Sequence, residues 1–299
     1  MTDKPLVSVR LMVYNNQSFI SQCIESILAQ KTNFLVEVII GDDFSSDNSL
    51  EIINSYKSTN NVKIKVLKRP LNGEYWNKRK SKDGSVKTNF IDILENCKGK
   101  YIALLDGDDY WIDSNKLQKQ VDFLEKNNDY FFVSANSEVL NNNNIYRTNL
   151  EGDLDLEDFI TGNKLGRQTS AFLFRNDGVA CFIESLKRYN WPFNDLLLIF
   201  WCMTKGKGRV LDDLMVCYRI HENGIWTSTN QEQRFKNFII FYSLLFKSEI
   251  NKSYNISSFN KSIDWIIRQI KVVNQTTKIH KNISRKILSY FKNILKTKS

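Results

Sequence analysis

The chain has 299 residues, of which 42% are hydrophobic and 25% charged, proportions that suit one large globular domain or a domain with an appendage. The net charge of +9 favours a partner that carries phosphate, which leaves nucleotides, nucleic acid and an anionic membrane as candidates. Five scattered cysteines without a C-x-x-C pair predict a reducing compartment, and the longest apolar run, residues 238–246, is too short to span a bilayer.

In the first 126 residues, strand patterns alternate with helix patterns. Strands are predicted over residues 6–14, 36–40, 62–66 and 101–105. Helices are predicted over residues 19–30, 47–56, 90–96 and 116–126, the second of them capped by Ser46 or Asp47. The polar stretch from Gly73 to Gly84 predicts an exposed loop. This alternation indicates right-handed crossovers and an α/β fold with a mostly parallel sheet and helices on both faces.

Beyond residue 136 the alternation is less regular. The pattern predicts a polar turn at 141–144, strands over 169–174 and 210–220, and helices over 179–186 and 195–204. From about residue 231 onward it is wholly helical, and after Lys261 the only acidic residue is Asp264. The sequence therefore predicts a basic, helical C-terminal appendage.

Carboxylates gather at the edge of the predicted sheet where its parallel strands end. Asp42 and Asp43 follow the second strand, and Asp106, Asp108 and Asp109 follow the fourth. Burying unpaired carboxylates is costly, so we expect this cluster to be open or to be joined by a cation. Mg²⁺ takes one or two protein carboxylates together with substrate phosphates, which favours a metal–diphosphate site here. The alternative is a set of acidic turns that cap helices, although separate turns have no reason to converge on one edge.

Six segments match a known pattern in its order and cover about residues 5–228. They are residues 7–15 (VSVRLMVYN), 26–30 (SILAQ), 37–47 (EVIIGDDFSSD), 99–111 (GKYIALLDGDDYW), 116–120 (KLQKQ) and 218–226 (YRIHENGIW). In these segments the chain resembles family 2 glycosyltransferases of the GT-A fold, the kind that build bacterial surface polysaccharides such as capsule and lipopolysaccharide. The resemblance implies a Rossmann-like GT-A domain over residues 1–228 and a basic helical region over 229–299.

The resemblance also implies roles on the donor side. Tyr14 matches the aromatic residue that stacks on the nucleotide base, and Asp43 matches the acid that hydrogen-bonds the base. Asp42 is then a turn or helix-cap residue. Asp106 is expected to face the ribose or the metal, and Arg219 to bind phosphate or to pair with a core carboxylate.

The metal and the catalytic base are implied in the same way. Asp108 is expected to ligate a divalent cation, Mn²⁺ or Mg²⁺, that bridges to the diphosphate, with His221 near the same cation. Asp109 either joins this site or supports its loop. Asp195 matches the carboxylate that takes the proton of the acceptor hydroxyl in one-step inverting transfer, and the alternative is a plain N-cap. Many relatives carry a Glu-Asp pair where this chain has Asn194 before Asp195.

Two further segments have open roles. Residues 167–170 (RQTS) are candidates for a contact with the acceptor or the donor sugar. The loop that contains Trp76, Lys78, Arg79 and Lys80 is expected to be solvated rather than to close over the donor.

The expected function is a metal-dependent, inverting glycosyltransferase that moves a sugar from a nucleoside-diphosphate sugar, with UDP expected as carrier, to a glycan or lipid-linked acceptor. The alternatives are a catalytically inactive nucleotide-binding scaffold and a nucleotidyltransferase, although the Gly-rich N-terminal signature of the latter is absent. Nucleic acid is not expected as a partner, because an acidic edge repels it. Leu6–Val9 starts a strand rather than a signal peptide, so we expect a cytoplasmic enzyme whose basic end docks on the anionic inner face of the plasma membrane.

Overall fold

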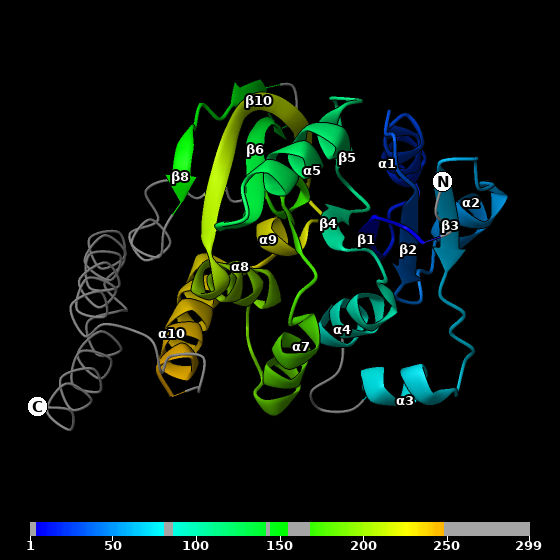
Figure 1. The fold of residues 1–299 in the computed structure, drawn as a ribbon. Coiled ribbons are helices and arrows are strands. Elements are labelled where there is room, and N and C mark those ends of the chain that lie inside the picture. The colour runs from blue at the N-terminus through cyan, green and yellow to red at the C-terminus, as the bar shows by residue number, and fades with distance from the viewer. Residues whose placement is uncertain (1–3, 81–85, 142–143, 155–167, 248–299) are drawn as a thin grey trace, which may run out of the picture.

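The computed structural model describes residues 4–80, 86–141, 144–154 and 168–247 (Figure 1). In this part of the chain, ten strands form one sheet in the order β3–β2–β1–β4–β9–β6–β10–β5, with β7 beside β6 and β8 beside β10. The strands are β1 Val7–Val13, β2 Val36–Asp42, β3 Val62–Val66, β4 Tyr101–Asp106, β5 Tyr110–Trp111, β6 Tyr130–Asn141, β7 Asn144–Arg147, β8 Gly152–Leu154, β9 Leu173–Arg175 and β10 Lys207–Ile220.

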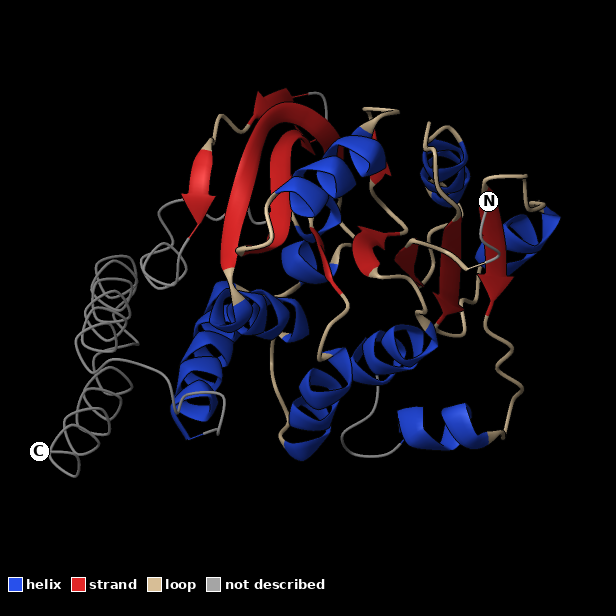
Figure 2. Cartoon of the chain, in the orientation of Figure 1, coloured by secondary structure: helices blue, strands red, loops and turns tan. Residues whose placement is uncertain are grey.

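The sheet is mixed, with a parallel half that matches the sequence prediction. Strands β3, β2, β1 and β4 are parallel to one another. Strand β9 then runs antiparallel to both β4 and β6, while β6 and β10 are parallel to each other. The long β10 curves over this half of the sheet and carries the short β5 antiparallel at its edge (Figure 2).

Helices cover both faces of the sheet, as the alternating pattern predicts. The helices are α1 Ile20–Leu28, α2 Ser49–Ser55, α3 Glu74–Lys80, α4 Val86–Asn96, α5 Lys116–Lys126, α7 Val179–Arg188, α8 Asn194–Lys205, α9 Ile225–Ser228 and α10 Gln231–Lys247, with a 3-10 turn, η1, at Thr169–Ala171. Apolar residues of α1 and α5 share one buried cluster. Those of α4, α7 and α8 share the other.

Strand β1 separates these two clusters through its period of two. Val7, Val9, Leu11 and Val13 face the cluster that contains α1 and α5. Met12 packs against the opposite cluster, with α4, α7 and α8. Residues at even positions of β1 therefore share a face with helix α8, which begins at Asn194.

Several sequence predictions need correction. The stretch between Gly73 and Gly84 is not a plain loop, because α3 occupies Glu74–Lys80. The strand predicted over residues 169–174 divides into the turn η1 and the short strand β9. Strand β6, the longest neighbour of β10, has no counterpart among the predicted elements.

The C-terminal prediction is tested only in part. Helix α10 packs on the domain, since Phe241 and Leu245 belong to the cluster that contains α8. The basic stretch after Lys261 and the candidate Arg167 lie outside the described residues. Within the described ranges, no helix is long and apolar enough to cross a membrane.

Candidate donor and metal site

Three strand ends meet at one edge of the sheet. The register pairs Val13 of β1 with Asp42 of β2, and Met12 of β1 with Asp106 of β4. The chain then turns at Gly107, whose N–H donates to the Met12 carbonyl at 2.9 Å. A Cβ at Gly107 would lie 2.8 Å from Oδ1 of Asn16, so the close approach of this turn to the β1–α1 loop needs glycine.

Asp106 is held at this edge by two neighbours. Its Oδ1 accepts from Nη2 of Arg10 at 2.9 Å, and its Oδ2 accepts from the Thr169 hydroxyl at 3.1 Å. The Asp106 side chain is 37% exposed, whereas that of Arg10 is 2% exposed. The Asp106 carboxylate is therefore held by Arg10 and Thr169 and remains partly open to solvent.

Asp108 faces His221 across the strand ends. Its Oδ2 lies 3.1 Å from Nε2 of His221, which follows β10. Arg219 forms no ion pair with this carboxylate. Its Nη1 donates to the backbone carbonyl of Asp108 at 2.5 Å, and its Nη2 donates to the side chain of Gln22. The guanidinium also lies 4.5 Å from the ring centre of Tyr110. Arg219 thus fixes the loop and leaves the Asp108 carboxylate to His221.

Asp109 supports the loop. Its carboxylate is buried and accepts from the Ser170 hydroxyl at 2.6 Å and from the Arg219 backbone N–H at 3.0 Å. Burial and then the charge of Asp108 raise the pKa of Asp109 well above its usual range. Asp109 therefore ties β4 to η1 and β10.

Asp195 is the candidate catalytic base. It lies in the first turn of α8 and is partly buried. Burial raises its pKa, and the negative charge of Asp106 raises it further, while Arg10 acts in the opposite direction. The pKa of the Tyr218 phenol is raised by burial and by the charges of all four carboxylates, those of Asp109, Asp108, Asp106 and Asp195. One phenol therefore lies within electrostatic reach of both the acidic edge and the start of α8.

A second group of side chains surrounds Asp43. Its Oδ1 accepts from the Tyr75 hydroxyl at 2.7 Å and from Nε of Arg79 at 2.8 Å. Both donors come from α3, one helical turn apart. The guanidinium of Arg69 lies 3.8 Å from the ring centre of Tyr75. The expectation that Arg79 is merely solvated is wrong for the structure, because this side chain forms an ion pair with the buried Asp43.

The neighbours of Asp43 have separate tasks. Asp42 accepts from the backbone N–H and the hydroxyl of Ser45, which is the turn role expected for it. The turn continues through Phe44, whose φ is +60°. Tyr14 is 54% exposed at the end of β1, so its ring is available to a ligand.

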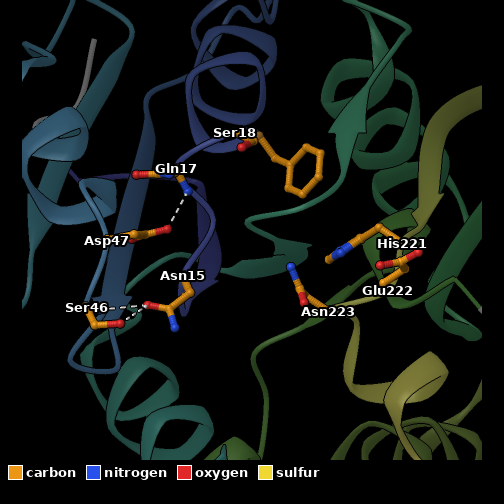
Figure 3. Close-up of a pocket in the computed structure, with 9 residues that line it drawn as sticks. Asn15, Gln17, Ser18, Ser46, Asp47, His221, Glu222 and Asn223 are labelled. Atoms are coloured by element: carbon orange, nitrogen blue, oxygen red, sulfur yellow. Dashed lines mark hydrogen bonds between the residues drawn. The ribbon is translucent and has the colours of Figure 1, made fainter.

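A cavity of about 460 Å³ is lined in part by His221 (Figure 3). Its walls are the loop after β1 with Asn15 and Gln17, the loop after β2 with Asp47, and the turn from His221 to Asn223. Several of these side chains bind the neighbouring loop, since Asn15 accepts from the Ser46 N–H at 2.8 Å and Asp47 accepts from the Gln17 N–H at 3.0 Å. The cavity is thus a polar space between the loops after β1 and β2 on one side and the turn after β10 on the other.

Comparison with known proteins decides the family. The sequence model described as glycosyl transferase family 2 matches residues 8–185, which is more than half of the chain. The chain belongs to glycosyltransferase family 2. It is 28% identical over 238 residues to an uncharacterized protein of Mycobacterium tuberculosis, and this match covers 76% of the chain and 62% of that relative. The chain thus spans less than two thirds of that relative's length.

Two further matches are to a named glycosyltransferase and to a solved structure. It is 33% identical over 196 residues to the Escherichia coli UDP-Glc:alpha-D-GlcNAc-diphosphoundecaprenol beta-1,3-glucosyltransferase WfgD, covering 64% of this chain and 66% of that one. Among solved structures, Staphylococcus aureus TarS residues 1–349 align with a TM-score of 0.63 at 14% identity, over 92% of this chain and 76% of that one. The second likeness concerns the fold, and it confirms the GT-A architecture.

The motifs named Asp43, Asp106, Asp108, His221 and Asp195 as candidates, and their roles in the site stay predictions. The structure places Asp43, Asp106 and Asp108 at or just after the ends of β2 and β4, and it pairs Asp108 with His221. The residues around Asp43 were missed because α3 was taken for a loop, although Tyr75 and Arg79 have the spacing of one helical turn. This spacing is the sequence signal that could have identified Tyr75 and Arg79 as partners on one face of a helix.

Proposed function

We propose that this glycosyltransferase moves a sugar from a UDP-sugar to a hydroxyl of a glycan or lipid-linked acceptor, with inversion and with a divalent cation. The observation that carries the proposal is the Asp108–His221 pair, which no arginine in the described part of the chain neutralises and whose histidine lines a polar cavity. The names of related proteins support the donor and acceptor classes. WfgD is named for UDP-glucose and a diphosphoundecaprenol acceptor, and one TarS structure contains UDP.

The residues present fit a divalent cation. A carboxylate and an imidazole are ligands that Mn²⁺ accepts, and Mg²⁺ commonly uses one or two carboxylates with substrate phosphates. No group of three or more His, Cys, Asp or Glu side chains forms a metal cage in the described part of the chain. The Asp108–His221 pair would therefore hold a cation only together with the diphosphate. A bound cation would stabilise the negative charge that develops on the leaving diphosphate.

The protein side chains would divide the remaining work. Tyr14 would stack on the base and Asp43 would hydrogen-bond it, with Tyr75 and Arg79 holding that carboxylate in place. Asp106, anchored by Arg10 and Thr169, would face the ribose. Asp195 would accept the proton of the acceptor hydroxyl as that oxygen attacks the sugar carbon from the face opposite the diphosphate. Its raised pKa would bring it closer to the working pH of a general base.

A thermal-shift panel of nucleoside diphosphates and nucleotide sugars, with and without Mn²⁺, tests the proposal. We expect stabilisation by UDP or a UDP-sugar that requires Mn²⁺ and disappears in Asp108→Ala. Transfer of a labelled sugar to a lipid-diphosphate-linked glycan would then confirm the activity, and the anomeric configuration of the product would test inversion. If no nucleotide stabilised the protein under any condition, the proposed donor and with it the proposed reaction would be refuted.

We also propose that residues 1–228 are the catalytic domain of a cytoplasmic enzyme and that the basic segment after residue 278 assists its docking on anionic membrane. Lysine and arginine side chains in that segment alternate with Ile, Leu and Phe at helical spacing. Each basic residue near an anionic surface contributes about 1 kcal/mol of attraction. A lipid-linked acceptor would make this docking useful.

A further inference from the structure

Two of the six segments that carry the family resemblance, residues 26–30 and 116–120, have no part in the proposed reaction. Their polar side chains are nevertheless buried. Lys116 and Gln120 of α5 are both 0% exposed, and Gln30 after α1 is 5% exposed. Lysine and glutamine are mostly exposed in folded proteins, and buried polar groups need partners. The partners of these side chains therefore indicate what the two segments do.

Lys116 lies in the first turn of α5 with its side-chain nitrogen enclosed. Nζ donates to Oε1 of Gln120, one helical turn further on, at 2.7 Å. It also lies 4.5 Å from the ring centre of Trp111 of β5. No carboxylate of the described residues forms an ion pair with Lys116, and burial lowers its pKa to about 7 against the opposite effect of Asp113. An apolar side chain would fill this position at lower cost, so the lysine is better explained by what it holds.

The amide of Gln120 extends this contact to η1. Its Nε2 donates to the carbonyl of Ala171 at 2.9 Å. An amide between a nitrogen donor and a carbonyl acceptor has one favourable orientation, so Lys116 sets the direction in which Gln120 donates. Trp111 holds the same turn from β5, since its Nε1 donates to the Ser170 carbonyl at 2.9 Å. Two consecutive carbonyls of η1 are thus held by α5 and β5.

The end of α1 holds Trp111 and the start of α5. The Ser26 hydroxyl accepts from the backbone N–H of Trp111 at 3.1 Å. The Gln30 amide donates to the Asp113 carbonyl at 2.9 Å and accepts from the Leu117 N–H at 3.0 Å. The two segments without an assigned role therefore form one buried polar network around β5 and η1.

The side chains of η1 bind the acidic edge. The Thr169 hydroxyl donates to Oδ2 of Asp106 at 3.1 Å, and the Ser170 hydroxyl donates to Oδ2 of Asp109 at 2.6 Å. The backbone of η1 is bound by the buried polar network, and its side chains are bound to two carboxylates. Because η1 has only three residues, its position depends on these contacts.

We propose that Lys116 and Gln120 are positioning residues for sugar transfer: together they fix η1, and η1 in turn fixes the carboxylates of Asp106 and Asp109 on either side of Asp108. The inference rests on the proposed function, which assigns the donor diphosphate and its cation to this edge. Partners that orient the ligands of a metal commonly set its affinity even though they do not touch it. Lys116 and Gln120 would act in this way through η1.

Two substitutions interrupt the network at different links. Gln120→Glu keeps the size of the side chain and an acceptor for Lys116, but it loses the donor to the Ala171 carbonyl. Lys116→Met keeps the apolar stem and removes the nitrogen that orients the Gln120 amide. The matched controls lie on the same helix: Val121→Ala removes buried apolar volume, and Lys119→Met removes a lysine that is 42% exposed. Either test variant suffices if the other does not fold.

Titration with UDP, with and without Mn²⁺, measures the site, and thermal unfolding measures the fold. We expect the Mn²⁺-dependent affinity for UDP to fall about tenfold in both test variants, as is common for partners that orient metal ligands. Lys116→Met should nevertheless unfold at the wild-type temperature or above it, because an apolar side chain replaces a buried lysine. Val121→Ala should unfold at a lower temperature and bind UDP as wild type does. Lys119→Met should resemble wild type in both measurements.

Amide hydrogen exchange of the protein without ligand gives a second readout. The N–H groups of Asp109, Ala171 and Phe172 form the backbone hydrogen bonds of the two turns that the network is proposed to hold. We expect Gln120→Glu to exchange faster than wild type in peptides that cover residues 106–111 and 169–173, because these turns open locally. Val121→Ala should not accelerate exchange selectively in these two peptides.

Wild-type affinity for UDP with Mn²⁺ in Gln120→Glu, or wild-type exchange in both peptides, would overturn the inference. So would UDP affinities that simply follow the unfolding temperature across Lys116→Met and Val121→Ala, as a purely structural defect would produce. Wild-type protein that binds no UDP under any condition would instead refute the proposed function, and the exchange comparison would still test whether the network holds η1.

Discussion

Arg79→Gln tests whether α3 belongs to the donor site. The substitution removes one of the two donors that hold Oδ1 of Asp43, while the Tyr75 hydroxyl remains. A hydrogen bond between charged groups contributes about 1.5–3 kcal/mol. The Arg79 side chain is 28% exposed, and solvent screening reduces the expected value to about 1 kcal/mol. That energy corresponds to an affinity for UDP about fivefold weaker.

Isothermal titration with UDP and Mn²⁺ measures this change directly. Lys78→Gln is the matched control, because it removes a positive charge from the same helix, where Lys78 pairs with the exposed Glu74. We expect Lys78→Gln to bind UDP as wild type does. UDP affinity in Arg79→Gln that equals or exceeds that of Lys78→Gln would refute the role of α3 in the site. The turnover number at saturating donor should change little in either variant, because neither residue lies near Asp195 in the proposed mechanism.

Four further outcomes follow from the structure. Asp108→Asn should abolish the Mn²⁺-dependent part of UDP binding and leave the metal-free part, as measured by titration with and without chelator. Asp195→Asn should lower kcat by about 10²–10⁴-fold with unchanged UDP affinity. In wild type, activity should be lost as the pH falls through the raised pKa of Asp195, because the base is then protonated. Gly107→Ala should lower the free energy of unfolding by about 1–3 kcal/mol in denaturant titration, because its Cβ would lie 2.8 Å from Asn16. Deletion of the segment after residue 278 should weaken binding to anionic liposomes and leave UDP-sugar hydrolysis intact; equal liposome binding would contradict the docking role.

The parallel half of the fold was predictable because its signals are local. Strands β1, β2 and β4 are short apolar runs and β3 alternates with lysines, while β1 is followed by a helix with a regular apolar face. Such alternation predicts parallel neighbours joined by crossovers, as in the order β3–β2–β1–β4. The helix predicted over 116–126 has the observed bounds. Acidic residues at the ends of such strands must share one edge, which is why Asp43, Asp106 and Asp108 were found together.

The second half depends on pairings between distant segments. β9 is only three residues long and inserts antiparallel between β4 and β6, which no local pattern specifies. β10 contains register shifts around Leu214, so its alternation of side chains is interrupted. These long-range pairings bring His221 to Asp108. The motif predicted that His221 lies near the same cation as Asp108, and the direct contact of 3.1 Å between the two side chains depends on the curved path of β10.

Arg10 shows a different limit. A single charged residue within the apolar run of residues 7–13 adds little to a strand pattern and is read as a tolerated exception. In the structure it is among the most buried large side chains and forms an ion pair with a residue 96 positions away. Burying a cation is costly unless an opposite charge pairs with it, and the carboxylate of Asp106 at the end of β4 does so. The exception to the strand pattern is therefore explained by a long-range ion pair, which links the buried strand to the acidic edge of the sheet.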